Sequence, residues 1–260
     1  MVGRLLHVRM PQPIARRVVQ WFARTYQIDV DAAGKPLHQY PSIGHFFVRD
    51  LAVGLRPIEG DFVSPVDGTL RNFGVVSEGR IEQVKGKSYT LVKFLGDDAN
   101  AKRYEKGVFF NFYLSPQDYH HVHSPVSGKI PRSVHIPGKL WPVNDWSMAN
   151  IDEIFSINER VVTCIDSAFG RVTVVMIGAT NIGKISVEYD SFISNSAAVD
   201  RTMARHYEPP KDIKAGDRLG TFHMGSSVVV LVEPGRVDLE RVRLHAGKKV
   251  QYGAAILHGE

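Results

Sequence analysis

The chain has a single cysteine, Cys164, among its 260 residues. One cysteine excludes a disulfide within the chain, so the protein is not one of the small disulfide-stapled scaffolds. Cys164 lies in the apolar run 161–165, which is typical of a buried strand. A free cysteine in such a place behaves as a small apolar side chain, and we assign it no catalytic role.

Long hydrophobic runs and a strong excess of one charge are also missing. No window of about 18 apolar residues is present, so we expect no transmembrane helix, and we expect no secretory signal. Lys and Arg number 32 against 27 Asp and Glu, which gives a net charge of +5. This mild basic excess fits nucleic acid, an anionic membrane surface or an ordinary solvated surface, and does not choose among them. The 43% of hydrophobic residues is enough for a substantial core.

Residues 14–26 carry the pattern of an amphipathic helix. Its apolar face contains Ile14, Ala15, Val18, Trp21, Phe22 and Tyr26, and its polar face contains Arg16, Arg17, Gln20 and Arg24. The pattern fits a basic helix lying in a membrane interface, and it fits equally a helix packed on the core of its own domain.

After about residue 60, short β-rich runs alternate with Gly and Pro turn signals. The runs are 80–84, 108–114, 161–165, 171–177, 184–189 and 228–232. A weaker helical pattern covers 89–95, and we expect the polar stretch 194–214 to be a loop. The sequence therefore predicts an α+β protein that is mainly β. We expect N-terminal amphipathic helices over residues 1–58 and a β core over 59–260.

The turn sequence Ser-Pro-Val-Asp-Gly at 64–68 recurs as Ser-Pro-Val-Ser-Gly at 124–128. In each copy Pro fixes φ before the bend and Gly permits the turn into a short β run. The copies are either two independent turns or a duplicated β-hairpin module in a sandwich-like core. A duplication would place the two turns near each other and would bring Asp67 beside the histidines at 120–123.

Three histidines, His120, His121 and His123, precede the second turn. In an extended segment His121 and His123 point one way and His120 the other. Structural zinc usually takes four ligands, often cysteines, and no second histidine pair stands at metal spacing, so we assign no metal site. One histidine that acts as a base and is oriented by a carboxylate is the more economical interpretation.

Gly225-Ser226 precedes the apolar run 228–232, where such a pair normally means a turn. The pair also suits an N→O acyl shift, because glycine lets the Ser226 hydroxyl approach the preceding carbonyl. The shift needs a base and a carboxylate that orients it, and His123 and Asp67 are candidates.

These residues together resemble the phosphatidylserine decarboxylase family. The segment 113–123 (YLSPQDYHHVH) resembles the family's Tyr-Leu-Ser-Pro-x-Asp-Tyr-His-x-Val-His motif, and the turn at 64–68 resembles its Pro-x-Asp-Gly turn. Shorter matches occur at 46–49, 55–58, 158–160 and 175–180. The resemblance runs from about residue 21 to about residue 242, with the motifs in the family's order.

The resemblance implies that Asp67, His123 and Ser226 form a self-processing triad. Cleavage at Gly225-Ser226 would leave a large subunit, 1–225, and a small subunit, 226–260, that begins with a pyruvoyl group made from Ser226. The pyruvoyl group would convert phosphatidylserine to phosphatidylethanolamine and CO2 through a Schiff base. His120 matches a family histidine near the substrate carboxylate, as proton donor or contact, and His121 occupies a variable position.

The family's cleavage motif is usually Leu-Gly-Ser-Thr, whereas this chain has Met224 and Ser227 around the intact Gly-Ser pair. The departure bears on the rate of cleavage. A lipid substrate favours the membrane interpretation of the helix at 14–26 and gives no role to nucleic acid. We expect peripheral association with the cytoplasmic face of the cell membrane, and the family analogy extends to a homodimer.

Three alternatives remain open on the sequence. A pyruvoyl enzyme could act on a soluble amino acid, although the resemblance across the chain and the amphipathic helix argue against this. A processing-dead homologue could only bind lipid. A lipoyl- or biotinyl-like carrier would use a lysine at a hairpin tip, and Lys85 and Lys87 lie near such a turn.

Overall fold

The computed structural model describes residues 7–84, 86–179, 184–194, 201–223 and 225–258. Its helices are α2 (Gln12–Thr25), η1 (Leu37–Gln39), α3 (Ile43–Phe47), α4 (Leu91–Leu95), α5 (Asp98–Arg103), α6 (Asp145–Asn150), α7 (Ile154–Ile157) and η3 (Leu239–Arg241). Its strands are β1 (Gly68–Val75), β2 (Arg80–Val84), β3 (Lys87–Thr90), β4 (Val108–Leu114), β5 (His121–His123), β6 (Gly128–Ile136), β7 (Arg160–Ser167), β8 (Gly170–Gly178), β9 (Ile185–Val187), β10 (Met203–Ile213), β11 (Arg218–Phe222), β12 (Ser226–Val232) and β13 (Lys248–Val250). The prediction of a mainly β, α+β protein is confirmed.

An antiparallel eight-stranded sheet in the order β10-β6-β7-β8-β12-β4-β1-β13 organises the core. One face packs on the three-stranded sheet β5-β11-β9, with Val228, Val230 and Phe222 in the shared core. The other face packs on α4, α7 and the β2–β3 hairpin, with Val229 and Leu231 in that core. β12 is buried along its whole length because alternate side chains enter the two cores.

The two similar turns lie side by side, as a duplicated module requires. Val63 N–H donates to the Pro125 carbonyl at 2.9 Å, and His123 N–H donates to the Pro65 carbonyl at 2.8 Å. Within each turn the serine hydroxyl donates to the carbonyl two residues later, from Ser64 and from Ser124. The strands that follow, β1 and β6, each lie second from an edge of the large sheet. The two turns therefore precede strands at corresponding positions near the two edges of that sheet.

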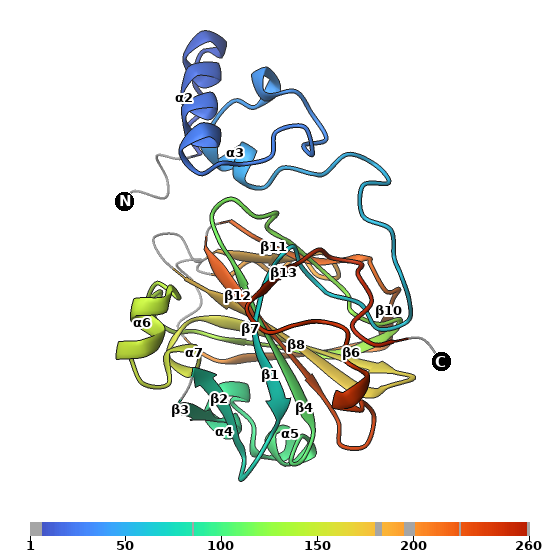
Figure 1. Cartoon of the computed structure of the whole chain (residues 1–260). Helices are drawn as coiled ribbons and strands as arrows, with labels where there is room; N and C mark the ends of the chain where they lie inside the picture. The colour runs from blue at the N-terminus through green and yellow to red at the C-terminus, as the bar shows by residue number, and fades with distance from the viewer. Residues whose placement is uncertain (1–6, 85, 180–183, 195–200, 224, 259–260) are drawn as a thin grey trace.

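The N-terminal helices lie at one end of the β core, at the top of Figure 1. α2 begins after Pro11 and carries Pro13 in its first turn, where a missing N–H costs no helical hydrogen bond. Val19, Phe22 and neighbouring side chains form a small core with α3. Within the described residues, no helix is both long enough and apolar enough to cross a bilayer.

The predicted faces of α2 are partly wrong. The helix buries Val19 and Ala23, whereas Ile14 is 52% exposed and Trp21 is 61% exposed. One stripe of the helix therefore packs on α3, and an adjacent stripe that includes Ile14 and Trp21 is exposed. Arg16, Arg17 and Arg24 are exposed as well.

The expectation of a loop over 194–214 is wrong for its second half, which forms β10 and pairs with β6. β10 is an edge strand in which most residues are half-buried or exposed, so few of its side chains are apolar. Residues 195–200 lie outside the described residues. The helical pattern at 89–95 is half right, since helix α4 begins at Leu91 and Tyr89 belongs to β3.

Candidate active site

Gly225 and Ser226 stand at the point where the chain enters the centre of the large sheet. Ser226 is the first residue of β12 and pairs with Leu114 of β4 and Gly178 of β8. Its side chain is fully buried, and its hydroxyl has no hydrogen-bond partner among the described residues. The Gly225 carbonyl accepts a hydrogen bond of 3.1 Å from the Ala179 N–H. A buried hydroxyl that makes no hydrogen bond costs free energy and calls for an explanation, and the adjacent Ser227 hydroxyl shares this property within the described residues.

A cavity of about 320 Å³ opens onto this pair. Phe22 of α2, Tyr26 directly after that helix and Phe47 of α3 form part of its wall. The remaining wall is mostly apolar and comprises Tyr113, Leu114, Pro116, Pro142, Val143, Asn144 and Ala179. The N-terminal helices therefore help to enclose Ser226.

His120 lies close to this cavity through Phe47, because the two rings pack with centroids 3.9 Å apart. Its backbone carbonyl accepts from Phe222 N–H at 2.9 Å. Nδ1 lies 2.8 Å from the Asp118 carbonyl, which can only accept, so Nδ1 carries the proton. Nε2 is therefore an unprotonated, buried atom without a partner among the described residues. Burial, and then the charge of Arg49, lowers the pKa of His120 to about 3.

His121 is held at both ring nitrogens. Nε2 donates to the Val48 carbonyl at 3.1 Å, and Nδ1 accepts from the Thr221 hydroxyl at 2.7 Å. Burial lowers its pKa to about 4. These two hydrogen bonds connect β5 to β11 and to the segment after α3, which indicates a structural role.

His123 and Asp67 share a second cluster, with Tyr252 between them. The Tyr252 ring stacks on His123 at 3.8 Å, and the Tyr252 N–H donates to Asp67 at 2.9 Å. His123 Nδ1 donates to the Gly216 carbonyl at 2.7 Å, which leaves Nε2 as an acceptor 3.2 Å from the Tyr119 hydroxyl. Burial lowers the pKa of His123 to about 4, so its ring is neutral at pH 7.

Asp67 is paired with Arg56, whose Nη2 lies 2.6 Å from Oδ2. Among the described residues, no hydrogen bond joins Asp67 to His123, or His123 to Ser226. The structure thus brings the predicted residues into two clusters. One contains Asp67 and His123, and in the other the Phe47 ring connects His120 to the wall of the Ser226 cavity.

The register of β11 orders the histidines relative to the Gly-Ser pair. His123 pairs with Arg218 at the start of β11, whereas His120 bonds Phe222 at its end. Four residues of extended chain separate the two positions, which is about 13 Å along the strand. His120 is therefore on the side from which the chain continues to Ser226. Met224, which completes the predicted cleavage motif, lies outside the described residues.

The roles of Arg56 and Tyr252 at Asp67 were missed by sequence reasoning. Arg56 belongs to the Arg-Pro-Ile match at 55–58, and that match was its only signal. Tyr252 lies far from Asp67 along the chain, in a segment without a motif. Of the lysines considered for a carrier, Lys87 is ion-paired with Asp152 at 2.8 Å. Lys85 lies outside the described residues.

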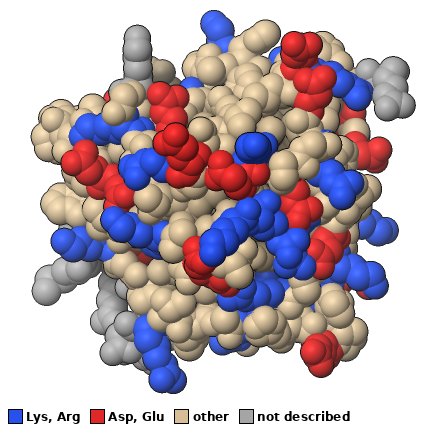
Figure 2. Space-filling model, turned by 90° about the horizontal axis from the view of Figure 1, so that it is seen from below, with Lys and Arg blue, Asp and Glu red and all other residues tan. Residues whose placement is uncertain are grey.

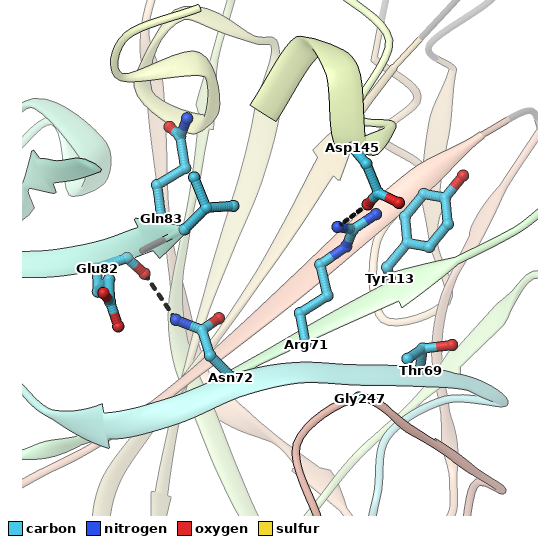
Figure 3. Close-up of a pocket in the computed structure, with 9 residues that line it drawn as sticks. Thr69, Arg71, Asn72, Glu82, Gln83, Tyr113, Asp145 and Gly247 are labelled. Atoms are coloured by element: carbon cyan, nitrogen blue, oxygen red, sulfur yellow. Dashed lines mark hydrogen bonds and ion pairs between the residues drawn. The ribbon is translucent and has the colours of Figure 1, made fainter. Parts of the chain in front are cut away.

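A second cavity, of about 720 Å³, lies on the other side of Tyr113, which lines both cavities. Figure 3 shows Arg71 reaching across it to Asp145, with the guanidinium 4.3 Å from the centre of the Tyr113 ring. Asn72 donates to the Glu82 carbonyl at the far end. In this cavity Arg71 is thus already paired with Asp145, and the Asn72 amide is already paired with the Glu82 carbonyl.

The family profile described as phosphatidylserine decarboxylase matches residues 43–258. The chain belongs to the phosphatidylserine decarboxylase family, a family of carboxy-lyases. A relative from Anaeromyxobacter sp. (strain K), named phosphatidylserine decarboxylase proenzyme, is 40% identical over 97% of this chain and 90% of its own. The similarly named protein of Myxococcus xanthus is 37% identical over 91% of this chain and 85% of its own. That of Brevibacillus brevis is 36% identical over 94% and 88%.

Proposed function

We propose that this chain is a phosphatidylserine decarboxylase that makes its own pyruvoyl group by cleaving between Gly225 and Ser226. The observation that carries the proposal is the buried Ser226 hydroxyl at the head of β12, which lies beside a cavity and has no hydrogen-bond partner among the described residues. The names of the relatives support it, because each is called a proenzyme.

In the proposed cleavage the Ser226 hydroxyl attacks the Gly225 carbonyl carbon and a histidine takes its proton. The carbon–nitrogen bond breaks as the Ser226 nitrogen gains a proton, which leaves an ester. Loss of the Cα proton and of the Gly225 carboxylate then gives dehydroalanine at position 226. Water converts that residue to a pyruvoyl group and releases ammonia.

We assign the base to His123 and its orientation to Asp67. Both side chains belong to the repeated-turn module, and Tyr252 holds them in one cluster. For Asp67 to accept a hydrogen bond from His123 Nδ1, the bond from Nδ1 to the Gly216 carbonyl must first break. Cleavage by His123 therefore requires a rearrangement that breaks this bond and also brings the His123 ring to Ser226, because the two residues lie in separate clusters in this structure.

A pyruvoyl group at position 226 fits these surroundings, because the Ser226 side chain already adjoins a cavity lined largely by apolar residues. The group supplies an electron sink for loss of a carboxylate as CO2. His120 is the residue we assign to the substrate carboxylate or to proton transfer. Its Nε2, which has no partner in the described part of the chain, is an acceptor at pH 7, so it must gain a proton before it can donate one.

The cleaved fragment 226–260 would be retained by β12. All seven residues of this strand pair with both β4 and β8, and all are buried. Cleavage at Gly225-Ser226 leaves the pairing of residues 227–232 with β4 and β8 intact. The two fragments would therefore remain one folded unit.

We assign membrane contact to the exposed stripe of α2. Ile14 and Trp21 are exposed beside Arg16, Arg17 and Arg24, which combines an apolar anchor with charges that attract anionic lipid. Phe22 of the same helix and Tyr26 directly after it line the cavity, so a lipid headgroup would be delivered close to Ser226. Figure 2 shows the opposite face, seen from below, where both charge signs interleave.

The test is decarboxylation of phosphatidylserine in liposomes, measured as CO2 release, alongside free serine. We expect activity on the lipid and none on free serine, with Ser226→Ala inactive on both. Activity on free serine alone would establish the soluble amino-acid alternative. Binding to liposomes without cleavage or CO2 release would establish the lipid-binding homologue.

A further inference from the structure

The peptide unit between Gly178 and Ala179 faces the bond that self-cleavage breaks. The Ala179 N–H donates to the Gly225 carbonyl oxygen at 3.1 Å, and Gly178 lies opposite Ser226 in the β8–β12 register. When a nucleophile attacks a carbonyl carbon, negative charge develops on the oxygen, and a fixed N–H donor stabilises that charge. A ground-state distance of 3.1 Å leaves room for the bond to shorten as the charge grows.

The other end of the same peptide unit is held by Asn158. Its Nδ2 donates to the Gly178 carbonyl at 3.0 Å and to the Trp141 carbonyl at 2.8 Å. Its Oδ1 accepts from the Trp141 N–H at 3.0 Å, and this contact fixes the orientation of the amide, since a backbone N–H can only donate. Asn158 is completely buried. Its three bonds therefore hold the plane of the Gly178–Ala179 peptide.

We propose that the Ala179 N–H is the oxyanion donor for the N→O acyl shift, and that Asn158 is the positioning residue that aims it. The inference rests on the proposed self-cleavage and adds the group that would stabilise its first intermediate. In that step the Ser226 oxygen bonds to the Gly225 carbon, its proton passes to the histidine, and the carbonyl oxygen becomes the oxyanion bound by Ala179. The hydrogen bond from Asn158 also polarises the Gly178–Ala179 amide, which strengthens its N–H as a donor.

The direct test replaces Ala179 by lactic acid during cell-free translation. This change keeps the methyl group and turns the N–H into an ester oxygen that cannot donate. We expect the fragment 226–260 to form about 100- to 1,000-fold more slowly, the usual effect of removing one oxyanion donor. The matched control is lactic acid at Ala101, whose N–H donates to the Asp97 carbonyl at 3.0 Å in α5. This control loses an equivalent bond and should cleave at the parental rate.

Asn158→Asp tests the positioning role, because it keeps the side-chain shape and the acceptor for Trp141 but loses both donated bonds. We expect cleavage about tenfold slower, the effect of weakening one hydrogen bond in the transition state. Gln83→Glu is its control. Gln83 is a buried amide that donates to Met148 and Ile151 and accepts from Ile154, so it has the same bonding pattern.

Hydroxylamine separates an effect on the acyl shift from an effect on elimination, because it cleaves an ester intermediate directly. For Asn158→Asp we expect hydroxylamine not to restore fragment formation, since the ester itself forms slowly. Restoration to the parental rate would overturn the proposal, as would a parental rate in the Ala179 ester variant. If the parent chain yields no fragment, the proposed function fails instead, so the two failures are distinguishable.

Discussion

Protonation of the base His123 should slow self-cleavage only at a pH well below the pH at which protonation of an ordinary histidine would slow it. Burial lowers the pKa of His123 to about 4 and that of His120 to about 3. His123, the assigned base, can accept the Ser226 proton only while its ring is neutral. With a pKa near 4, about nine-tenths of the base is still neutral at pH 5, so cleavage between pH 7 and pH 5 should change by about 10%. An ordinary histidine, with a pKa of 6.5, would lose about 25-fold over the same interval.

The assay is a short cell-free pulse of labelled chain, diluted into buffers from pH 8 to pH 4.5, with loss of the 260-residue band followed in time. Stability must be controlled, because the unfolded chain binds protons below about pH 6.5 while the buried histidines resist them down to about pH 4. The folded state therefore loses stability as pH falls through this window, by up to about 1.4 kcal/mol per pH unit for each such histidine. Circular dichroism of Ser226→Ala in the same buffers marks where the fold is intact. A fall in cleavage centred near pH 6.5 in folded protein would refute the reasoning.

Three further predictions concern single side chains. His120→Ala should permit cleavage but lower CO2 release from phosphatidylserine by about 100-fold or more, because it removes a proton-transfer group; a block of cleavage would reassign the base from His123 to His120. Trp21→Ser should weaken sedimentation with anionic liposomes while leaving cleavage unchanged, because Trp21 is exposed and does not line the cavity; unaltered sedimentation would contradict the membrane role of α2. In the uncleavable Ser226→Ala background, Leu231→Ala should lower the free energy of unfolding in urea by about 2–5 kcal/mol, since the side chain is fully buried; a loss below 1 kcal/mol would show that β12 contributes little to retention of the fragment.

Much of the β core was predictable because its strands are locally marked. The run of β-branched residues after Ser226 reads as a buried strand, and it lies at the centre of the large sheet. The repeated turn also predicted a long-range contact, which the bonds from Val63 and His123 realise. β10 was missed because an edge strand buries only part of one face and so carries few apolar residues.

The candidate site was predictable as a set of residue types but not as a network. Asp67 has its ion pair with Arg56, and Tyr252 contacts both Asp67 and His123 from near the end of the chain. Only the folded sheet brings such distant segments together. The same holds for the Ala179 N–H, because a backbone donor leaves no signal in side-chain chemistry.

Denaturing mass spectrometry of the purified protein tests the central claim most directly. The account predicts two chains, 1–225 and a 35-residue chain 226–260 that lacks a free N-terminal amine and carries a pyruvoyl group in place of Ser226. Ser226→Ala should give one intact chain of 260 residues. A single intact chain from the parent protein, purified under conditions in which it is folded, would contradict self-cleavage at Gly225-Ser226.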